Sequence, residues 1–323
     1  MVSAVVPGVS GSQAFSVGVQ LPTTDGFGTG YQDLRAVARA AEDAGLDSVW
    51  IGDHFSFRAP VIESFIAAAT VAAATDRIDI GFGVLIAPLR HPGWIAKQVS
   101  SLQVVSGGRV ILGLGVGGEF PGEWAALGVP ISERGKRIEA TLHALPGLLS
   151  GHTVELAAPW HTTVPPLTPY LGMPRLWIGG RAEAALERAV RHGAGWLGVW
   201  LDPPALAKRV RQLQDIAARL EQPTPPIAAE VLVHITDAPD RGERAMADFM
   251  ESIYGIPFER LARYCVGGTE QEVAERLIQL VAEGLHTIVL IPAVRNSLRT
   301  LPALGRIAAR LRATAPTTVV QAS

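Results

Sequence analysis

The feature that most constrains the fold is a repeated alternation between short apolar segments and amphipathic helical segments. Residues 34–44 carry apolar side chains at helical spacing, whereas 110–112, Val-Ile-Leu, has the apolar, β-branched character of a strand buried on both faces. The strand-like segments are 15–21, 47–51, 78–85, 110–112, 176–180, 196–201, 227–235 and 287–291. Regular alternation with short connections favours a closed (β/α)₈ barrel, a TIM barrel, over an open doubly wound α/β sheet.

Two stretches interrupt this alternation. The proline-rich segment 151–175, with room for a small hairpin, belongs to the fourth unit, and a short extra helix at 243–254 follows the seventh strand. The regular helices are expected at 34–44, 64–75, 94–105, 132–149, 182–192, 206–220, 270–283 and 301–311. We therefore expect a barrel with insertions after strands 4 and 7, built as one domain over residues 15–323 behind a flexible tail at 1–14.

Composition excludes several classes of function. Hydrophobic residues make up 48% of the chain and charged residues 18%, a balance typical of a folded enzyme with an ample core. A net charge of −2 provides no basic surface, so we expect neither nucleic acid nor membrane as a partner. Cys265 is the only cysteine, which excludes an intrachain disulfide and a cysteine metal cluster. With no secretory signal pattern in the first residues, we expect a cytoplasmic protein.

Candidate functional residues follow the ends of the predicted strands. A parallel barrel presents all these ends at one rim, where active sites of this fold lie. The rim residues are Asp53, His54, Gly83, Val84, Gly117, Glu119, Gly179, Gly180, Arg181 and Trp200. His54 is a candidate general acid or base because imidazole titrates near neutral pH, and Glu119 is a candidate partner for it. A structural histidine and an exposed loop acid are the alternatives.

Two glycine-rich segments have distinct consequences. The run 113–118 leaves bare backbone at the end of the fourth strand, over which a flat molecule can lie, although it fits the dinucleotide-binding fingerprint only loosely. Gly179-Gly180-Arg181 opens a helix, where free N–H groups, the helix dipole and a guanidinium favour binding of a phosphate. The alternative is that this segment is an ordinary tight turn between strand and helix. Gly267-Gly268-Thr269 is a weaker phosphate candidate, because Thr269 and Glu272 form a capping box that needs no ligand.

Other chemistries find less support. The remaining histidines show no evident ligand spacing, so no metal site is predicted. No Gly-x-Ser-x-Gly motif occurs, and Cys265 has no adjacent base, which disfavours a hydrolase with a nucleophilic side chain.

Four segments resemble, in order, those of the bacterial luciferase-like flavin and deazaflavin oxidoreductases. They are 44–55, containing Asp-Ser-Val-Trp-Ile-Gly-Asp-His-Phe, then 113–128, 177–180 and 266–269. The resemblance implies a (β/α)₈ barrel, usually a homodimer, that holds FMN or the deazaflavin F420 at the strand ends. It departs at Arg58, where sugar-phosphate dehydrogenases of the family carry an aromatic residue, and this disfavours a sugar phosphate as substrate.

The same resemblance implies roles for the rim residues. Asp53 and His54 would lie beside the ring system, and Gly83-Val84 matches a non-prolyl cis peptide bond that backs the ring in relatives. Gly179, Gly180 and Arg181 would hold the phosphate, and Glu119 would lie near the substrate. Gly117 and Trp200 complete the expected cofactor contacts.

Three hypotheses about function remain open at this point. The first is hydride transfer between F420 and a small organic substrate, with His54 or Glu119 moving the proton. The second is a monooxygenase that uses reduced FMN and oxygen, and the third is a barrel that binds a flavin without catalysis. Aromatic residues in the insertions favour an apolar or aromatic substrate; they are Trp124, Trp160, Tyr170, Phe249 and Tyr254.

Overall fold

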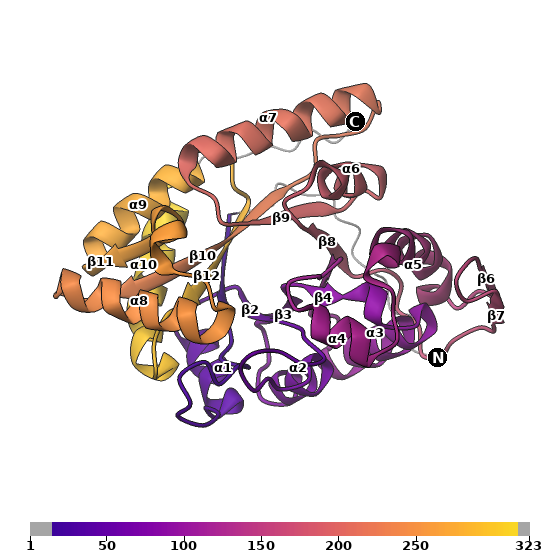
Figure 1. Ribbon diagram of the computed structural model, residues 1–323, viewed down its shortest axis with the longest axis horizontal. Coiled ribbons are helices and arrows are strands. Elements are labelled where there is room, and N and C mark those ends of the chain that lie inside the picture. Colours follow the sequence, from indigo (N-terminus) through magenta and orange to yellow (C-terminus); the bar gives the residue numbers. More distant parts are fainter. Residues whose placement is uncertain (1–14, 316–323) are drawn as a thin grey trace.

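Eight parallel strands close into a barrel in the computed structural model, which describes residues 15–315 (Figure 1). Each strand pairs with the next along the chain, and β10 pairs with both β9 and β12, so the ring has no gap in its pairing order. The strands are β1 (Ser16–Gln20), β2 (Ser48–Ile51), β3 (Asp79–Phe82), β5 (Val110–Gly115), β8 (Arg175–Gly179), β9 (Gly195–Val199), β10 (Ile227–Ile235) and β12 (Thr287–Pro292). The expected fold class is confirmed.

Helices surround this ring and cover its outer surface (Figure 1). The helices of the regular units are α1 (Leu34–Asp43), α2 (Ser64–Ala72), α3 (Pro92–Ser106), α5 (Arg134–Leu149), α6 (Glu183–Arg191), α7 (Pro203–Arg219), α9 (Glu270–Ala282) and α10 (Ser297–Thr314). Asp33 caps α1, and Thr269 and Glu272 form the expected capping box of α9. Among the described residues, no helix combines the length and apolar character needed to cross a bilayer.

The inside of the barrel below the rim is filled by side chains from six different strands. These are Trp50, Ile111, Trp177, Leu197, Ala228 and Val289. The two indoles fit because glycines face them: a Cβ on Gly18 would lie 2.5 Å from the Trp50 ring, and one on Gly195 would lie 2.3 Å from Trp177. The lower barrel is therefore a packed core, and any cavity has to lie at the rim.

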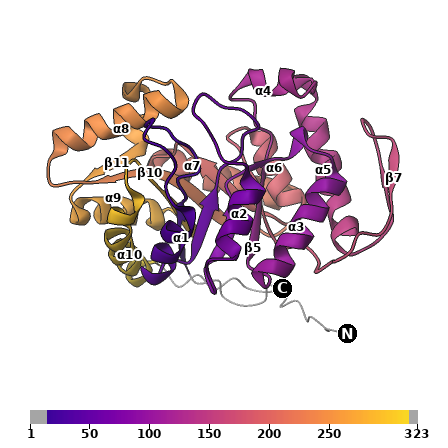
Figure 2. The ribbon, with the colours of Figure 1, turned by 90° about the horizontal axis from the view of Figure 1, so that it is seen from below.

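Both expected insertions occur. After β5 come the short helix α4 (Pro121–Ala126), the turn η2 (Ile131–Glu133) and, beyond α5, an antiparallel hairpin of β6 (Val154–Leu156) and β7 (Thr162–Val164). After β10 come α8 (Pro239–Tyr254), the turns η3 (Phe258–Arg260) and η4 (Ala262–Tyr264), and β11 (Cys265–Gly268). Figure 2 shows α4 and α8 at the same end of the barrel.

The structure differs from the sequence-based prediction in local detail. The predicted third strand, 78–85, is split into β3 and a two-residue strand β4 (Leu85–Ile86), followed by the turn η1 (Ala87–Leu89). Strand β11 was not predicted; it pairs with the end of β10 outside the ring. Its two glycines hide the usual strand pattern. The expected tail at 1–14 and residues 316–323 lie outside the described residues.

Candidate active site

A cavity of about 380 Å³ opens at the carboxyl ends of the barrel strands. Its lining includes all ten sequence-predicted site residues, which are Asp53, His54, Gly83, Val84, Gly117, Glu119, Gly179, Gly180, Arg181 and Trp200. They come from five strand ends that are far apart in sequence. The fold therefore brings these candidates together at one rim.

One wall of the cavity is built from Val84 and the glycines that face it. The Gly83–Val84 peptide bond is cis, at the position that the resemblance implied. The Val84 side chain occupies the space above two neighbouring strands, where a Cβ on Gly115 would lie 2.3 Å from it and a Cβ on Gly179 2.5 Å from it. Packing against Val84 thus requires glycine at both positions. Without side chains there, this wall of the cavity leaves room for a flat ligand.

The Asp53 carboxylate holds two segments of the rim together. It is only 4% exposed and accepts hydrogen bonds from Arg90 Nη1 and Nη2 at 2.6 and 2.8 Å. The Ser64 hydroxyl and the Ile86 backbone N–H donate to the same carboxylate at 2.9 and 2.8 Å. Both oxygens are therefore engaged within the chain. Asp53 lines the cavity, but its carboxylate ties β2 to the segment after the cis peptide bond.

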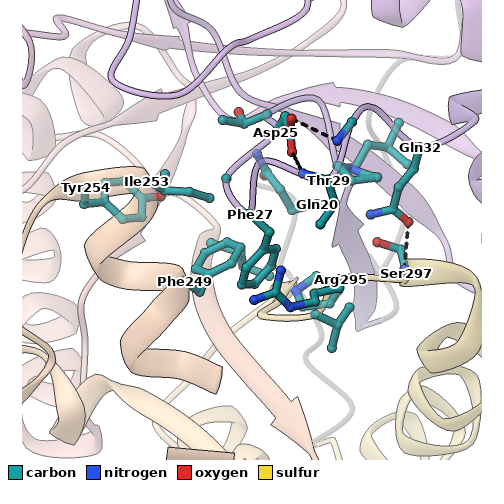
Figure 3. A pocket seen from close by; sticks show the side chains of 18 residues that line it. Gln20, Asp25, Phe27, Thr29, Gln32, Phe249, Ile253, Tyr254, Arg295 and Ser297 are labelled. Carbon is teal, nitrogen blue, oxygen red and sulfur yellow. Dashed lines mark hydrogen bonds between the residues drawn. The ribbon is translucent and has the colours of Figure 1, made fainter. Parts of the chain in front are cut away.

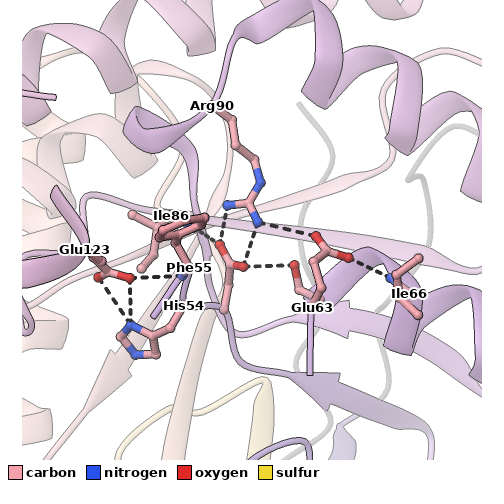
Figure 4. A network of polar contacts seen from close by, with 9 residues as sticks. His54, Phe55, Glu63, Ile66, Ile86, Arg90 and Glu123 are labelled. Atoms are coloured by element: carbon pink, nitrogen blue, oxygen red, sulfur yellow. Dashed lines mark hydrogen bonds and ion pairs between the residues drawn. The ribbon is translucent and has the colours of Figure 1, made fainter. Parts of the chain in front are cut away.

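His54 pairs with Glu123, and not with the Glu119 that the sequence suggested. Its Nδ1 lies 3.3 Å from both carboxylate oxygens of Glu123, and the Phe55 backbone N–H donates to Glu123 Oε2 at 3.0 Å (Figure 4). The imidazole also stacks on Phe57, with ring centroids 3.9 Å apart. With Nδ1 held by the carboxylate, Nε2 is the ring nitrogen left to act on a ligand.

Glu123 was missed because α4 was not predicted. Pro121 occupies the first turn of this six-residue helix, which turns Glu123 inward until its side chain is fully buried. A proline followed two residues later by an acid is a recognisable start of a helix, and it could have been found in the sequence. Glu119 lies nearby, exposed at the cavity.

A second missed acid lies deeper in the cavity. Glu230 on β10 has a buried Oε1 without a hydrogen-bond partner among the described residues, and Gln20 on β1 has a similar unpartnered Oε1. Burial and the nearby Glu119 charge raise the pKa of Glu230 to about 8, so the neutral acid dominates at pH 7. Burial also raises the pKa of Tyr254, which closes this side from α8.

The phosphate candidate lies at the start of α6. The N-cap residue Ala182 supplies no side-chain hydrogen bond, which leaves the first backbone N–H groups of the helix available. Gly180 has φ 142°, a conformation that favours glycine, and the exposed Arg181 follows it at the cavity. The start of α6 and the Arg181 side chain thus both border the cavity, a combination that favours an anion.

A smaller cavity of about 90 Å³ adjoins the first one and shares Gln20, Thr24 and Tyr254 with it. Its wall combines Phe27 and Phe249, whose ring centroids are 5.7 Å apart (Figure 3). The Arg295 guanidinium lies over the Phe27 ring at 4.6 Å from its centroid. Of the aromatic residues expected near the substrate, Phe249 and Tyr254 line a cavity, whereas Trp124, Trp160 and Tyr170 do not line either one.

Comparison with known proteins decides the family. The family model described as luciferase-like monooxygenase matches residues 13–260, which is most of the chain. The chain belongs to the luciferase-like monooxygenase family. As in the sequence-based resemblance, the match covers the strands that carry His54, the cis peptide bond and the α6 phosphate candidate.

Individual relatives of this luciferase-like chain include both uncharacterized and deazaflavin-dependent proteins. It is 33% identical over 209 residues to the uncharacterized protein Rv0940c of Mycobacterium tuberculosis, covering 57% of this chain and 72% of that protein. It is 32% identical over 179 residues to the F420-dependent glucose-6-phosphate dehydrogenase of Beutenbergia cavernae, covering 51% and 52% of the two chains. A solved structure of an F420-dependent secondary alcohol dehydrogenase with an F420-acetone adduct superimposes with a TM-score of 0.80 at 14% identity, over 92% of this chain and 99% of that one.

Proposed function

We propose that this luciferase-like protein is an oxidoreductase that transfers a hydride between the deazaflavin coenzyme F420 and a small organic substrate. The observation that carries the proposal is one cavity that combines a glycine-lined wall, the start of α6 with Arg181 beside it and an imidazole held by a carboxylate. The F420-dependent relative of Beutenbergia cavernae adds support for this cofactor class. Membership in the family supports an oxidoreductase in general.

The residues present fit a flat tricyclic ring with a phosphate-bearing chain. Side chains at Gly115 and Gly179 would displace Val84, so the wall that faces the ring depends on their absence. The unpartnered oxygens of Gln20 and Glu230 are suited to N–H and carbonyl groups at a ring edge, since neutral Glu230 can both donate and accept. Arg181 and the N–H groups that begin α6 would bind the phosphate.

F420 would supply the hydride donor or acceptor, and the protein would supply orientation and proton transfer. The Glu123 carboxylate fixes His54 through Nδ1, so His54 Nε2 would give a proton to the substrate atom beside the reacting carbon, or take one from it. Glu119, exposed at the cavity, is the second group within the same space that could carry this proton. Tyr254 and Trp200 would limit the access of water to the cavity. Their rings contact edge to face, with centroids 5.7 Å apart.

The second candidate is a monooxygenase that uses reduced FMN and oxygen, as the family description allows. The same wall and phosphate site suit FMN, and the same residues would orient it. We place it second because the sequence resemblance of the Glu119 segment is to deazaflavin enzymes. The substrate would extend into the smaller cavity, where Phe27 and Phe249 favour an apolar or aromatic group.

Cofactor titration tests the proposal. Purified protein, freed of any co-purified cofactor, is titrated with F420 and with FMN while fluorescence is followed. We expect saturable binding with preference for F420, and Arg181→Gln should weaken it about 10–100-fold because a charge-assisted hydrogen bond to phosphate is lost. Arg299→Gln, an exposed arginine outside both cavities, is the matched control. Preference for FMN would favour the second candidate, and no saturable binding of either would refute both.

One variant, compared with the wild type, then separates catalysis from binding. His54→Gln should bind the preferred cofactor as the wild type does and lose about 10²–10⁴-fold in turnover with an accepted substrate. A bound cofactor with no turnover in the wild type, across alcohols, carbonyl compounds and activated alkenes, would favour the non-catalytic hypothesis. The family resemblance also predicts a homodimer, which sedimentation analysis tests.

A further inference from the structure

Three potential metal ligands meet on the outer surface of the barrel, away from the cavity. Glu139 and His143 lie one turn apart on α5, and His192 ends α6. One ligand atom from each side chain lies within 4.8 Å of the others. No metal site was predicted from the sequence, although Glu139 and His143 lie four positions apart, a ligand spacing on a helix. His192 comes 53 positions after Glu139.

The distances suit a metal ion better than a direct hydrogen bond. His192 Nε2 lies 3.4 Å from Glu139 Oε2, which is long for a hydrogen bond between these groups. Two ligands that each bind Zn²⁺ at 2.0–2.1 Å in a tetrahedral arrangement are roughly 3.3 Å apart. The observed separation therefore needs almost no adjustment to place one ion between the two side chains.

His143 is oriented as a metal ligand usually is. Its Nδ1 lies 2.8 Å from the backbone oxygen of Glu139, so Nδ1–H donates this bond and Nε2 keeps its lone pair. Metal-binding histidines commonly donate their second ring N–H to a backbone carbonyl in this way. The rings of His143 and His192 meet edge to face with centroids 5.1 Å apart, and one ring nitrogen of each lies within 4.8 Å of the other.

The surrounding charges leave the carboxylate available. Arg188 Nε donates to Glu139 Oε1 at 2.7 Å, while no arginine among residues 15–315 donates to Oε2, the oxygen that faces His192. Arg188 thus fixes the carboxylate from one side, in the manner of an outer-shell partner. Arg191 also lines this surface and moderates the affinity for a cation.

We propose that Glu139, His143 and His192 form a binding site for one divalent transition-metal ion of the zinc type. Two imidazoles and one carboxylate suit Zn²⁺, Co²⁺ or Ni²⁺, whereas Mg²⁺ and Ca²⁺ require more oxygen ligands. Three protein ligands leave a fourth position for water. The ion would link α5 to the end of α6, two helices of consecutive barrel units, and its binding does not depend on the proposed cofactor.

Zinc binding to the full-length protein tests this site. Chelator-treated protein is titrated with ZnCl₂ by calorimetry, and we expect the wild type to bind one equivalent more than His143→Gln or His192→Gln, or to bind it at least 10-fold more tightly. His152→Gln, an exposed histidine just after α5 and outside the cluster, should bind zinc as the wild type does. Titration with MgCl₂ should give no corresponding difference between the variants.

Thermal unfolding gives an independent measurement. Zn²⁺ should raise the Tm of the wild type and of His152→Gln, with no corresponding rise in His143→Gln, because a ligand that binds only the folded state stabilises it. His143 is exposed, so its replacement leaves the fold intact and keeps the test valid even if His192→Gln unfolds. Equal zinc binding and equal Tm shifts in wild type and His143→Gln would overturn the proposal, as would a wild type that binds no zinc.

Discussion

Replacement of Asp53 by asparagine should destabilise the protein although it changes one atom. The carboxylate accepts four hydrogen bonds, two of them from the Arg90 guanidinium. Asparagine keeps one acceptor and presents an NH₂ group in place of the other. The best orientation turns this NH₂ toward the Ser64 hydroxyl, which can accept, and still loses the bond to Arg90 Nη2.

The magnitude follows from burial. The side chains of Asp53 and Arg90 are 1% and 19% exposed, so solvent screens this pair only weakly. Loss of one charge-assisted hydrogen bond costs about 1.5–3 kcal/mol, and breaking a buried ion pair outright costs about 3–5 kcal/mol. We therefore expect Asp53→Asn to lower the free energy of unfolding by about 2–5 kcal/mol.

Urea unfolding followed by circular dichroism measures this loss as a shift in midpoint at constant slope. Glu270→Gln is the matched control, because it removes one partner of the Glu270–Arg306 pair, whose arginine is 61% exposed, and should change the midpoint far less. The double variant Asp53→Asn, Arg90→Gln should be less destabilised than the sum of its single variants. A single-variant loss no larger than the control's, or strict additivity, would refute the reasoning.

Three further predictions concern other buried groups of the site. Burial raises the pKa of Glu230 to about 8, so the neutral acid stabilises the fold; this contribution is fully present below pH 4.5 and is lost as pH rises through 8. Glu230→Gln should remove this pH-dependent decline in stability. Urea midpoints of wild type and variant at pH 5 and pH 8.5 measure it. Gly115→Ala should lower the free energy of unfolding by about 1–3 kcal/mol, because the new Cβ would lie 2.3 Å from Val84. The control Gly135→Ala, in helix α5, should be neutral or stabilising, because its Cβ would lie 3.6 Å from the nearest atom. Glu123→Gln should cost about 1–3 kcal/mol in the same assay, since one acceptor for His54 and Phe55 is lost, and the exposed Glu119→Gln should leave the midpoint nearly unchanged.

The sequence predicted the barrel because its period is regular and each apolar strand segment is buried on both sides. Burial covers every residue of β2, β5 and β12, as continuous apolar runs indicate. The rim residues could also be predicted, since parallel strands place their ends together whatever the helices between them do. The cis bond at Gly83–Val84 came from the family resemblance and not from the residues themselves.

The partners of these residues could not be predicted in the same way. The start of α4 is recognisable in the sequence, but its six residues are too few to show a period, so the contact of Glu123 with His54, 69 positions away, could not be read from them. Asp53 was expected beside a cofactor, yet its carboxylate holds Arg90, a residue with no distinguishing pattern in the sequence. The alternation of residues in β10 predicts which face of the strand Glu230 occupies. It does not predict that Glu230 Oε1 lacks a hydrogen-bond partner among the described residues. Contacts of this kind depend on the tertiary packing that periodicity does not encode.

Strand β10 changes neighbours along its length. Its first residues pair with β9 up to Val199 opposite Glu230, and its last residues pair instead with β11, outside the ring. Beyond that point two residues of α8, Ile253 and Tyr254, line the cavity, and the Tyr254 ring contacts that of Trp200, which follows β9. Substitutions at these α8 positions therefore change the mouth of the cavity while the main-chain hydrogen bonds that close the barrel stay in place.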